Sequence, residues 1–325
     1  MEKTKLIGYA SAILGGLSFG TIPVFSATLR DLGASSFEQS VMRLFFGAIV
    51  GLVIILLFMP FQPKMVKQSM RFTGQRGYML QGLILAIMII LYLSSIVLGT
   101  PAGEAALLIQ VHPFVTLILG WILFREKITI SKVVALVFAL GGLILLVHPW
   151  DLDSFLSSAV GDALALLLGI LYAGYIMTSR WNNKNIRGVT PIVSVSWILI
   201  WTLLIGLPFL FIMRLFNLPS IIIGFSFENI FIPKILLNGI LLAVIGGLVP
   251  YGFIMMASRY LEASRASILL LSEPVGAMVL AYLFLHEAIT LWYLLGGFAI
   301  ICAVVITILA KSKEEIIITE SLEKI

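Results

Sequence analysis

AALLIQVHPFVTLILGWILFREKIT, at residues 105–129, recurs at residues 266–290 as ASILLLSEPVGAMVLAYLFLHEAIT. At a constant offset of 161 residues, seven positions are identical: Ala105/Ala266, Leu108/Leu269, Pro113/Pro274, Leu119/Leu280, Glu126/Glu287, Ile128/Ile289 and Thr129/Thr290. Each copy is an apolar stretch with a central proline and a closing Glu-x-Ile-Thr. Internal repeats in apolar chains are typical of many membrane transporters. The repeat therefore favours a duplicated membrane architecture.

The composition predicts an integral membrane protein. Of the 325 residues, 60% are hydrophobic and 11% are charged, and the mean hydropathy is +1.11. A soluble domain carries about 25% charged residues. No soluble domain fits between the apolar runs, so we expect one transmembrane domain over residues 1–310 and a charged cytoplasmic tail over residues 311–325.

Ten apolar runs predict an all-α protein with ten transmembrane helices, because a spanning helix needs about 20 apolar residues. The predicted spans are 6–29, 38–59, 77–98, 103–124, 132–148, 159–179, 190–213, 235–258, 265–285 and 291–310. The first run has no signal-peptide cleavage site and is interpreted as an uncleaved span.

The basic residues predict the orientation. With a cytoplasmic N-terminus, 17 of the 21 lysines and arginines fall in cytoplasmic segments. Only Arg30, Arg214 and Lys234 fall outside, and Arg43 lies within a span. Positive charge concentrates on the cytoplasmic side of membrane proteins. We therefore expect both termini in the cytoplasm, and the net charge of +5 reflects orientation and gives no indication of nucleic-acid binding.

The position of the repeat predicts two inverted halves. Five spans separate the two copies, and an odd number reverses the direction in which the second copy crosses the membrane. Repeat one then covers about residues 6–148 and repeat two about residues 159–310. Inverted repeats place their binding sites near the bilayer midplane, between the repeats.

This arrangement resembles the EamA type of the drug/metabolite transporter superfamily. The resemblance rests on residues 104–129 and 265–290, above all on SEPV at residues 272–275 and on Glu126 with Glu287. It implies a ten-helix secondary transporter that works by alternating access, and many such transporters export amino acids, amines or other metabolites. The Lys/Arg pairs that bind phosphate in related plastid carriers are not evident in the spans, which argues against a sugar-phosphate substrate.

His112 and Glu273 are the leading candidates for a substrate cavity. They occupy matching repeat positions, each directly before a proline, and each lies near the middle of its predicted span. An ionisable group at that depth costs about 2.5–3.5 kcal/mol on insertion scales and is a functional candidate by default. The pair can bind an amine, carry a proton, or do both. The alternative is structural: His112 satisfied by a backbone carbonyl and Glu273 by a buried hydroxyl.

Pro113 and Pro274 predict helix kinks. Each removes one helix hydrogen bond and frees the carbonyl four residues earlier, at Ile109 and Leu270. We expect either kinks that move during alternating access, with these carbonyls facing the cavity, or static kinks packed by neighbouring helices.

Further charged residues lie near the predicted span ends. Glu104 suits a helix N-terminus or the outer mouth of a cavity. Glu126 and Glu287 precede Thr129 and Thr290, the expected N-caps of the next spans, and are interpreted as helix-end support or as gating residues. Arg43 is expected to pair with Glu38 or to extend toward the interface.

Aromatic and small residues complete the candidate set. Tyr92, Tyr172, Trp201 and Tyr251 lie well inside spans and are candidates for the cavity wall or for core packing. Gly16/Gly20 and Gly47/Gly51 have a spacing that permits close helix contact. We interpret them as packing within the bundle, and a homodimer remains open.

Soluble enzyme motifs are absent from the sequence. It has no Walker A motif, no dinucleotide-binding turn and no zinc signature, and its single cysteine, Cys302, is interpreted as a packing residue. We predict no cofactor, no metal and no enzymatic activity. The expected protein lies in a prokaryotic inner membrane and exports a small metabolite such as an amino acid or amine, with protons as the first choice of driving ion. The alternatives are a multidrug or nucleoside-type carrier, a facilitated exchanger, a membrane-embedded enzyme and a non-transporting scaffold.

Overall fold

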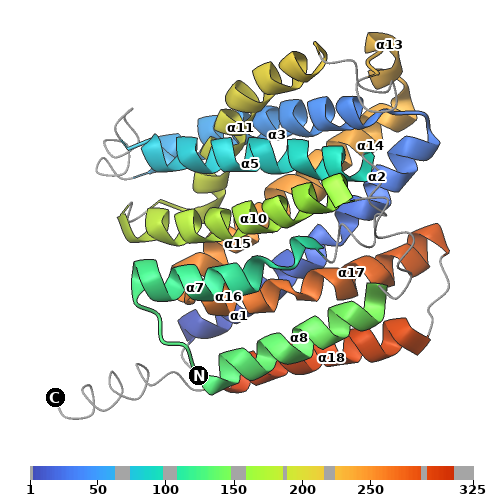
Figure 1. The fold of residues 1–325 in the computed structure, drawn as a ribbon. Coiled ribbons are helices and arrows are strands. Elements are labelled where there is room, and N and C mark those ends of the chain that lie inside the picture. The colour runs from blue at the N-terminus through green and yellow to red at the C-terminus, as the bar shows by residue number, and fades with distance from the viewer. Residues whose placement is uncertain are drawn as a thin grey trace.

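The computed structural model describes residues 3–62, 74–97, 108–147, 159–185, 189–215, 224–286 and 291–310. Within these ranges the regular structure is helical throughout (Figure 1). The first half comprises α1 (Lys3–Phe19), α2 (Thr21–Asp31), α3 (Ser36–Phe58), the 3-10 turn η1 (Met59–Phe61), α5 (Arg76–Val97), α7 (His112–Phe124) and α8 (Ile130–Val147). The second half comprises α10 (Ala159–Asn185), α11 (Pro191–Met213), α13 (Phe227–Ile230), α14 (Pro233–Ala243), the π-helix η2 (Val244–Leu248), α15 (Val249–Tyr260), α16 (Ala263–Leu270), α17 (Ser272–Leu280), the π-helix η3 (Ala281–Leu285) and α18 (Leu291–Leu309).

Six helical segments are long and apolar enough to cross a membrane. These are Lys5–Asp31, Ser36–Phe61, Val160–Asn185, Pro191–Ile212, Pro233–Tyr260 and Ala263–Phe284. Shorter apolar helices occupy the four remaining predicted positions, at Arg76–Tyr92, His112–Phe124, Ile130–Leu145 and Leu294–Leu309. The all-α membrane prediction is confirmed, and six of the ten predicted spans reach full membrane length within the described residues.

One predicted boundary is wrong by about two helical turns. Helix α10 continues from Ala159 to Asn185, past the predicted end at residue 179. Two polar side chains of its last turns, Ser179 and Asn182, are buried against α5. The Asn182 amide donates to Gln81 at 2.5 Å, and Gln81 donates to Ser179 at 2.6 Å. Tertiary hydrogen bonds therefore extend a helix that hydropathy alone ends too early.

The helix contacts follow the repeat: when a helix of one half packs on a helix of the other half, their counterparts pack on each other as well. Helix α1 packs on α15, and its counterpart α10 packs on α5; α1 also packs on α16 and α17, as α10 does on α7. The pairs α3/α11, α7/α16 and α8/α18 each join counterparts from the two halves. In Figure 1, α8 and α18 lie side by side at one edge of the bundle, and α3, α5 and α11 lie toward the opposite edge. Side chains of α7 and α16 therefore meet between the halves, and α17 packs on α1 of the first half.

The repeat extends to individual backbone angles. Arg125 follows α7 with φ 55° and ψ 32°, and His286 follows η3 with φ 56° and ψ 30°. These two are the non-glycine residues with positive φ among the described residues, and they are separated by the same offset as the sequence repeat. The left-handed conformation is unfavourable for L-residues. Its occurrence at both matching positions indicates that the two copies of the repeat share the same turn geometry.

Candidate functional site

Helix breaks bring His112 and Glu273 to equivalent positions. Helix α7 begins at His112, with Pro113 as its second residue. Helix α17 begins at Ser272, so Glu273 and Pro274 are its second and third residues. Proline suits the first turn because the N–H it lacks would have no helical partner there. Each side chain therefore lies at a break near the middle of its segment.

The carbonyls freed by the two prolines lie against neighbouring helices, which corresponds to the second of the two expected arrangements. A methyl group on Gly169 of α10 would lie 2.6 Å from the oxygen of Ile109, and one on Gly16 of α1 would lie 2.7 Å from the oxygen of Leu270. Each carbonyl therefore packs against a glycine of a neighbouring helix, where only a residue without a Cβ leaves room. The predicted packing role of Gly16 agrees with this contact.

His112 is fully buried, and both of its ring nitrogens face side chains rather than a backbone carbonyl. Nδ1 lies 2.7 Å from the hydroxyl of Ser267 on α16, and Nε2 lies 3.2 Å from the amide oxygen of Gln110. Ser267 donates to Thr116 at 3.2 Å, and Thr116 donates to the carbonyl of His112 at 2.6 Å. These bonds join the two halves.

Gln110 connects the two leading candidates. Its side chain also lies close enough to interact with the carboxyl group of Glu273. The Oε2 atom of Glu273 is buried and has no hydrogen-bond partner within the described structure. A buried acceptor without a partner is unfavourable by about 1–3 kcal/mol. This atom therefore has free capacity to bind a donor.

Arg43 is part of this group, although the sequence predicted otherwise. Pro250 has no N–H, so the carbonyl of Gly246 lacks its usual helical donor. The Arg43 guanidinium donates to that carbonyl at 3.2 Å. It also lies next to Tyr251 and within electrostatic range of Glu273. The π-helical turn η2 contains Gly246, and such turns are frequent at functional sites.

The predicted pairing of Arg43 with Glu38 is wrong. Glu38 accepts from the backbone N–H groups of Ser35 and Ser226, both at 2.8 Å, and from Asn229 at 3.0 Å. It thereby caps its own helix and holds the segment around α13. The helix N-terminus satisfies the carboxylate locally, which leaves Arg43 free to reach the bundle interior.

Three tyrosines lie near Glu273. Tyr92, Tyr172 and Tyr251 each lie within electrostatic range of it. Tyr172 also packs on His112 with ring centroids 4.4 Å apart, and its buried hydroxyl has no partner among the described residues. The structure therefore brings five of the six predicted cavity residues together.

A narrow cavity adjoins this group. Its lining combines the polar groups of Arg43, Tyr251 and Thr202 with apolar side chains from α3, α5 and α11. We use the name central site for Arg43, Gln110, His112, Tyr172, Tyr251 and Glu273.

Trp201 does not belong to the central site. Its indole N–H donates to Gln75, directly before α5, at 3.1 Å. Gly82 of α5 provides the room, since a methyl group there would lie 2.6 Å from the Trp201 Cβ. This close helix contact directs the ring toward one end of the bundle.

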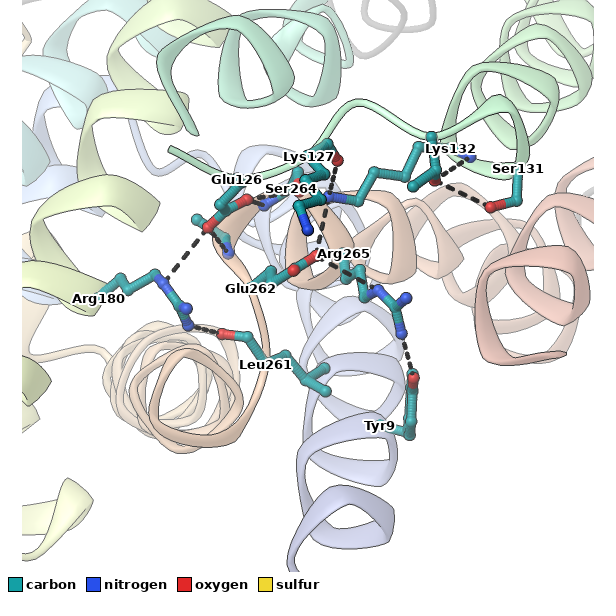
Figure 2. Close-up of polar contacts among 12 residues, drawn as sticks. Tyr9, Glu126, Lys127, Ser131, Lys132, Arg180, Leu261, Glu262, Ser264 and Arg265 are labelled. Atoms are coloured by element: carbon teal, nitrogen blue, oxygen red, sulfur yellow. Dashed lines mark hydrogen bonds and ion pairs between the residues drawn. The ribbon is translucent and has the colours of Figure 1, made fainter. Parts of the chain in front are cut away.

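A second polar group lies at the end of the bundle where α7 ends and α16 begins (Figure 2). Glu126 is buried and accepts from the N–H groups of Ala263 and Ser264 at 2.8 and 3.1 Å, and from the Ser264 hydroxyl at 2.6 Å. It also pairs with Arg180 of α10 at 3.3 Å. Glu126 thus supports a helix end as predicted, but the helix is α16 of the other half.

Further ion pairs extend this group. Glu262 pairs with Lys132 of α8 at 2.8 Å and with Arg265 of α16 at 3.4 Å. Arg265 donates to the Tyr9 hydroxyl of α1 at 2.9 Å (Figure 2). We call Glu126, Lys132, Arg180, Glu262 and Arg265 the charge cluster.

Two predicted residues, Glu104 and Glu287, lie outside the described residues. Among those described, no group of His, Cys, Asp and Glu is arranged to hold a metal ion.

Sequence reasoning missed Arg43 and Gln110 at the central site. Gln110 lies two residues before His112 in the quoted repeat, but an uncharged amide gave no signal. The signal for Arg43 was Gly246-Gly247 shortly before Pro250, a pattern that weakens a helix and frees a carbonyl.

The fold defines a multi-pass membrane protein with polar side chains buried between its two halves. It belongs to the EamA-like transporter family, whose sequence pattern matches residues 6–148 and 159–309. The resemblance inferred from the repeat is confirmed, and the family is one of transporters and not of enzymes.

Several known proteins are similar over most of the chain. An uncharacterized transporter of Archaeoglobus fulgidus is 26% identical over 92% of this chain and 95% of its own length. The Escherichia coli K12 protein named "Probable amino-acid metabolite efflux pump" is 28% identical over 65% of this chain and 68% of its own. A solved structure, described only as the crystal structure of a protein, has a TM-score of 0.66 at 15% identity over 93% and 95% of the two chains, which shows a shared fold.

Proposed function

We propose that the protein is a secondary-active exporter of small metabolites such as amino acids or amines. One observation carries this proposal: Arg43, which lines the cavity, lies within electrostatic range of Glu273, and Glu273 keeps a buried acceptor atom without a partner among the described residues. Buried charges are unfavourable in a bilayer and are kept where they bind something.

The chemistry of the central site favours a substrate with an ammonium group. The free oxygen of Glu273 accepts from a cation, and tyrosine rings attract cations through their faces. The guanidinium of Arg43 suits a carboxylate on the same substrate. The name of the Escherichia coli relative supports the amino-acid class. A multidrug or nucleoside-type carrier and a facilitated exchanger are the alternatives that a substrate screen separates.

The proposed architecture is ten transmembrane helices in two inverted halves, as a single domain. The paired helix contacts and the matching turns after α7 and η3 support this arrangement. The basic loops support cytoplasmic termini in a prokaryotic inner membrane. The substrate, protons and lipid are the proposed partners, and a homodimer is left to measurements of oligomeric state.

The charge cluster is the proposed cytoplasmic gate. Glu126 follows the helix that begins at His112, two residues after its end, and Arg265 lies on the helix that precedes Glu273. Fourteen residues of mostly helical chain between His112 and Glu126 correspond to about 20 Å. Movement at the central site therefore acts on the cluster through α7 and α16. Buried ion pairs contribute little net stability but serve well as switches.

A thermal-shift screen of the purified protein tests the substrate class. A ligand that binds the folded state raises Tm by mass action. We expect amino acids or amines to raise Tm in the native protein and in a Gln39→Leu control, which changes a buried glutamine elsewhere, and to have no effect on Glu273→Gln. Nucleosides as the stabilising class would favour the alternative carrier. Failure of every hit to be transported in proteoliposomes would contradict the proposed function.

A further inference from the structure

The hydrogen bonds around His112 fix the direction in which protons are donated. Thr116 donates to the backbone carbonyl of His112, so its hydroxyl oxygen is free to accept from Ser267. Ser267 has then used its only proton and must accept at its contact with His112 Nδ1. Nδ1 of His112 therefore carries a proton in this arrangement.

The amide of Gln110 lies between two further acceptors. Nε2 of a neutral His112 with a protonated Nδ1 is an acceptor, and so is an ionised Glu273. The amide has a donating NH2 on one side and an accepting oxygen on the other. The amide can flip by 180°, so that either side can face either neighbour. Because one side donates and the other accepts, both neighbours are satisfied only when one of them donates a hydrogen bond and the other accepts one.

Two arrangements meet this condition. In the first, His112 carries protons on both ring nitrogens, donates to the Gln110 oxygen, and the Gln110 NH2 donates to an ionised Glu273. In the second, the amide is turned, its NH2 donates to His112 Nε2, and a protonated Glu273 donates to the Gln110 oxygen. Both arrangements hold the same number of protons. When that shared proton leaves, the amide oxygen faces an acceptor, and buried mismatches of this kind are unfavourable.

We propose that Gln110 is a positioning residue that joins His112 and Glu273 into one unit binding a single shared proton. This inference rests on the proposed transport function, for which the unit supplies a reason for proton coupling. A substrate ammonium group that donates to Glu273 takes the place of the shared proton there. The proton is then released from the unit to solvent when the substrate binds, and the unit takes it up again when the substrate leaves.

Among the described residues, the other groups that face the unit keep a constant charge between about pH 5 and pH 8. Glu273 faces an arginine on α3 and tyrosines on α5, α10 and α15, namely Arg43, Tyr92, Tyr172 and Tyr251. His112 faces Tyr172 and the hydroxyl of Ser267. Among the described groups, a change of charge in this range can therefore come only from His112 and Glu273.

Nitrogen-15 NMR of the histidine ring tests the proposal in the full-length protein. The chain has three histidines, and replacing His148 and His286 by asparagine leaves His112 as the single labelled ring. The pH at which His112 titrates is measured in this parent, in Glu273→Gln, in Gln110→Leu and in the double variant. Gln110→Asn provides a second variant, because it keeps the amide but is too short to span both neighbours. Gln39→Leu serves as the matched control.

We expect Glu273→Gln to shift the His112 titration by at least about one pH unit, a tenfold change in proton affinity, when Gln110 is present. The shift should vanish in Gln110→Leu and Gln110→Asn and persist in Gln39→Leu. A shift of the same size without Gln110 would mean that the two groups interact through space, and it would overturn the proposal. No shift in the parent would overturn it as well. Because this measurement needs no transport, a protein that shows the coupling but moves no substrate would contradict the proposed function alone.

Discussion

Glu126, in the first half of the chain, accepts a 2.6 Å hydrogen bond from Ser264, the second residue of α16 in the second half. The carboxylate also accepts from two backbone N–H groups of that helix. A helix N-terminus carries unpaired N–H groups and a partial positive charge. The end of α7 thus provides the cap of α16.

Glu126→Gln is expected to weaken the closed cytoplasmic end. The substitution removes the negative charge that pairs with Arg180. It also leaves the side chain with fewer oxygen atoms that can accept hydrogen bonds from the N-terminus of α16. A Ser267→Cys reporter in a Cys302→Ala background should react at least about tenfold faster with a charged thiol reagent added to inside-out vesicles, a change of about 1.4 kcal/mol in the opening equilibrium. Glu38→Gln is the control, since Glu38 also caps a helix but accepts from Ser35 and Ser226, outside the charge cluster. Equal labelling in both variants would argue against a gate.

Glu273→Gln keeps the size of the side chain and removes its charge. Transport of a substrate identified by the thermal-shift screen should fall at least about tenfold, equivalent to about 1.4 kcal/mol, with normal expression. Uptake is measured in proteoliposomes between about pH 5.5 and pH 8. Unchanged kinetics across that range would leave Glu273 as a structural group.

His112→Gln combined with Glu273→Gln should be less damaging than the product of the single effects. Residues that act in one network show such non-additivity, whereas distant sites add within about 0.3–0.5 kcal/mol. The comparison uses initial transport rates of the two single variants and the double variant. Strict multiplicativity would place the two side chains in separate functional environments.

Gly169→Ala should destabilise the kink before α7. The added methyl group would lie 2.6 Å from the oxygen of Ile109, and such overpacking typically costs about 1–3 kcal/mol. Gly174→Ala on the same helix is the matched control, because a methyl group there meets nothing within 4 Å. Thermal unfolding in detergent should show a lower Tm for the first variant only. Equal Tm values would mean that the kink relaxes without cost.

Single cysteines at Ser36 and Ser69 test the orientation in a Cys302→Ala background. An impermeant maleimide added to intact cells should label Ser36→Cys and leave Ser69→Cys unlabelled, because the first position is expected outside and the second in a basic cytoplasmic loop. Permeabilised cells provide the control that both cysteines react. The reverse pattern would invert the proposed topology.

The repeat predicted the central site better than any local motif did. Because His112 and Glu273 occupy matching positions, the sequence predicted a common location, and the structure gives them a common partner in Gln110. The partner of Arg43 was wrong because the nearest carboxylate along the helix, Glu38, is satisfied by backbone N–H groups. Which carbonyl an arginine reaches across the bundle depends on the packing of α3 against η2, which no local pattern encodes.

The partners of residues at helix ends also depend on tertiary packing that no local pattern encodes. The sequence indicated that Glu126 supports a helix, but local reasoning selected the next helix along the chain. Thr129 satisfies that helix instead, by accepting from the N–H of Lys132 at 3.4 Å. The left-handed turn at Arg125 precedes Glu126, and only the packed arrangement of the two halves brings the N-terminus of α16 within its reach.

The two left-handed residues also offer a way to make the protein easier to handle. Arg125 and His286 each hold a backbone conformation that glycine adopts without strain, and the ends of α7 and η3 lie at opposite ends of the bundle (Figure 1). Glycine relieves backbone strain of about 1–2 kcal/mol at each position. The greater conformational freedom of glycine in the unfolded chain offsets about 0.5–1 kcal/mol of this gain in folding stability. Arg125→Gly and His286→Gly should therefore each raise Tm slightly in detergent, and their gains should add because the sites are far apart. The duplication that built the fold has left the same opportunity for thermostabilisation in both copies.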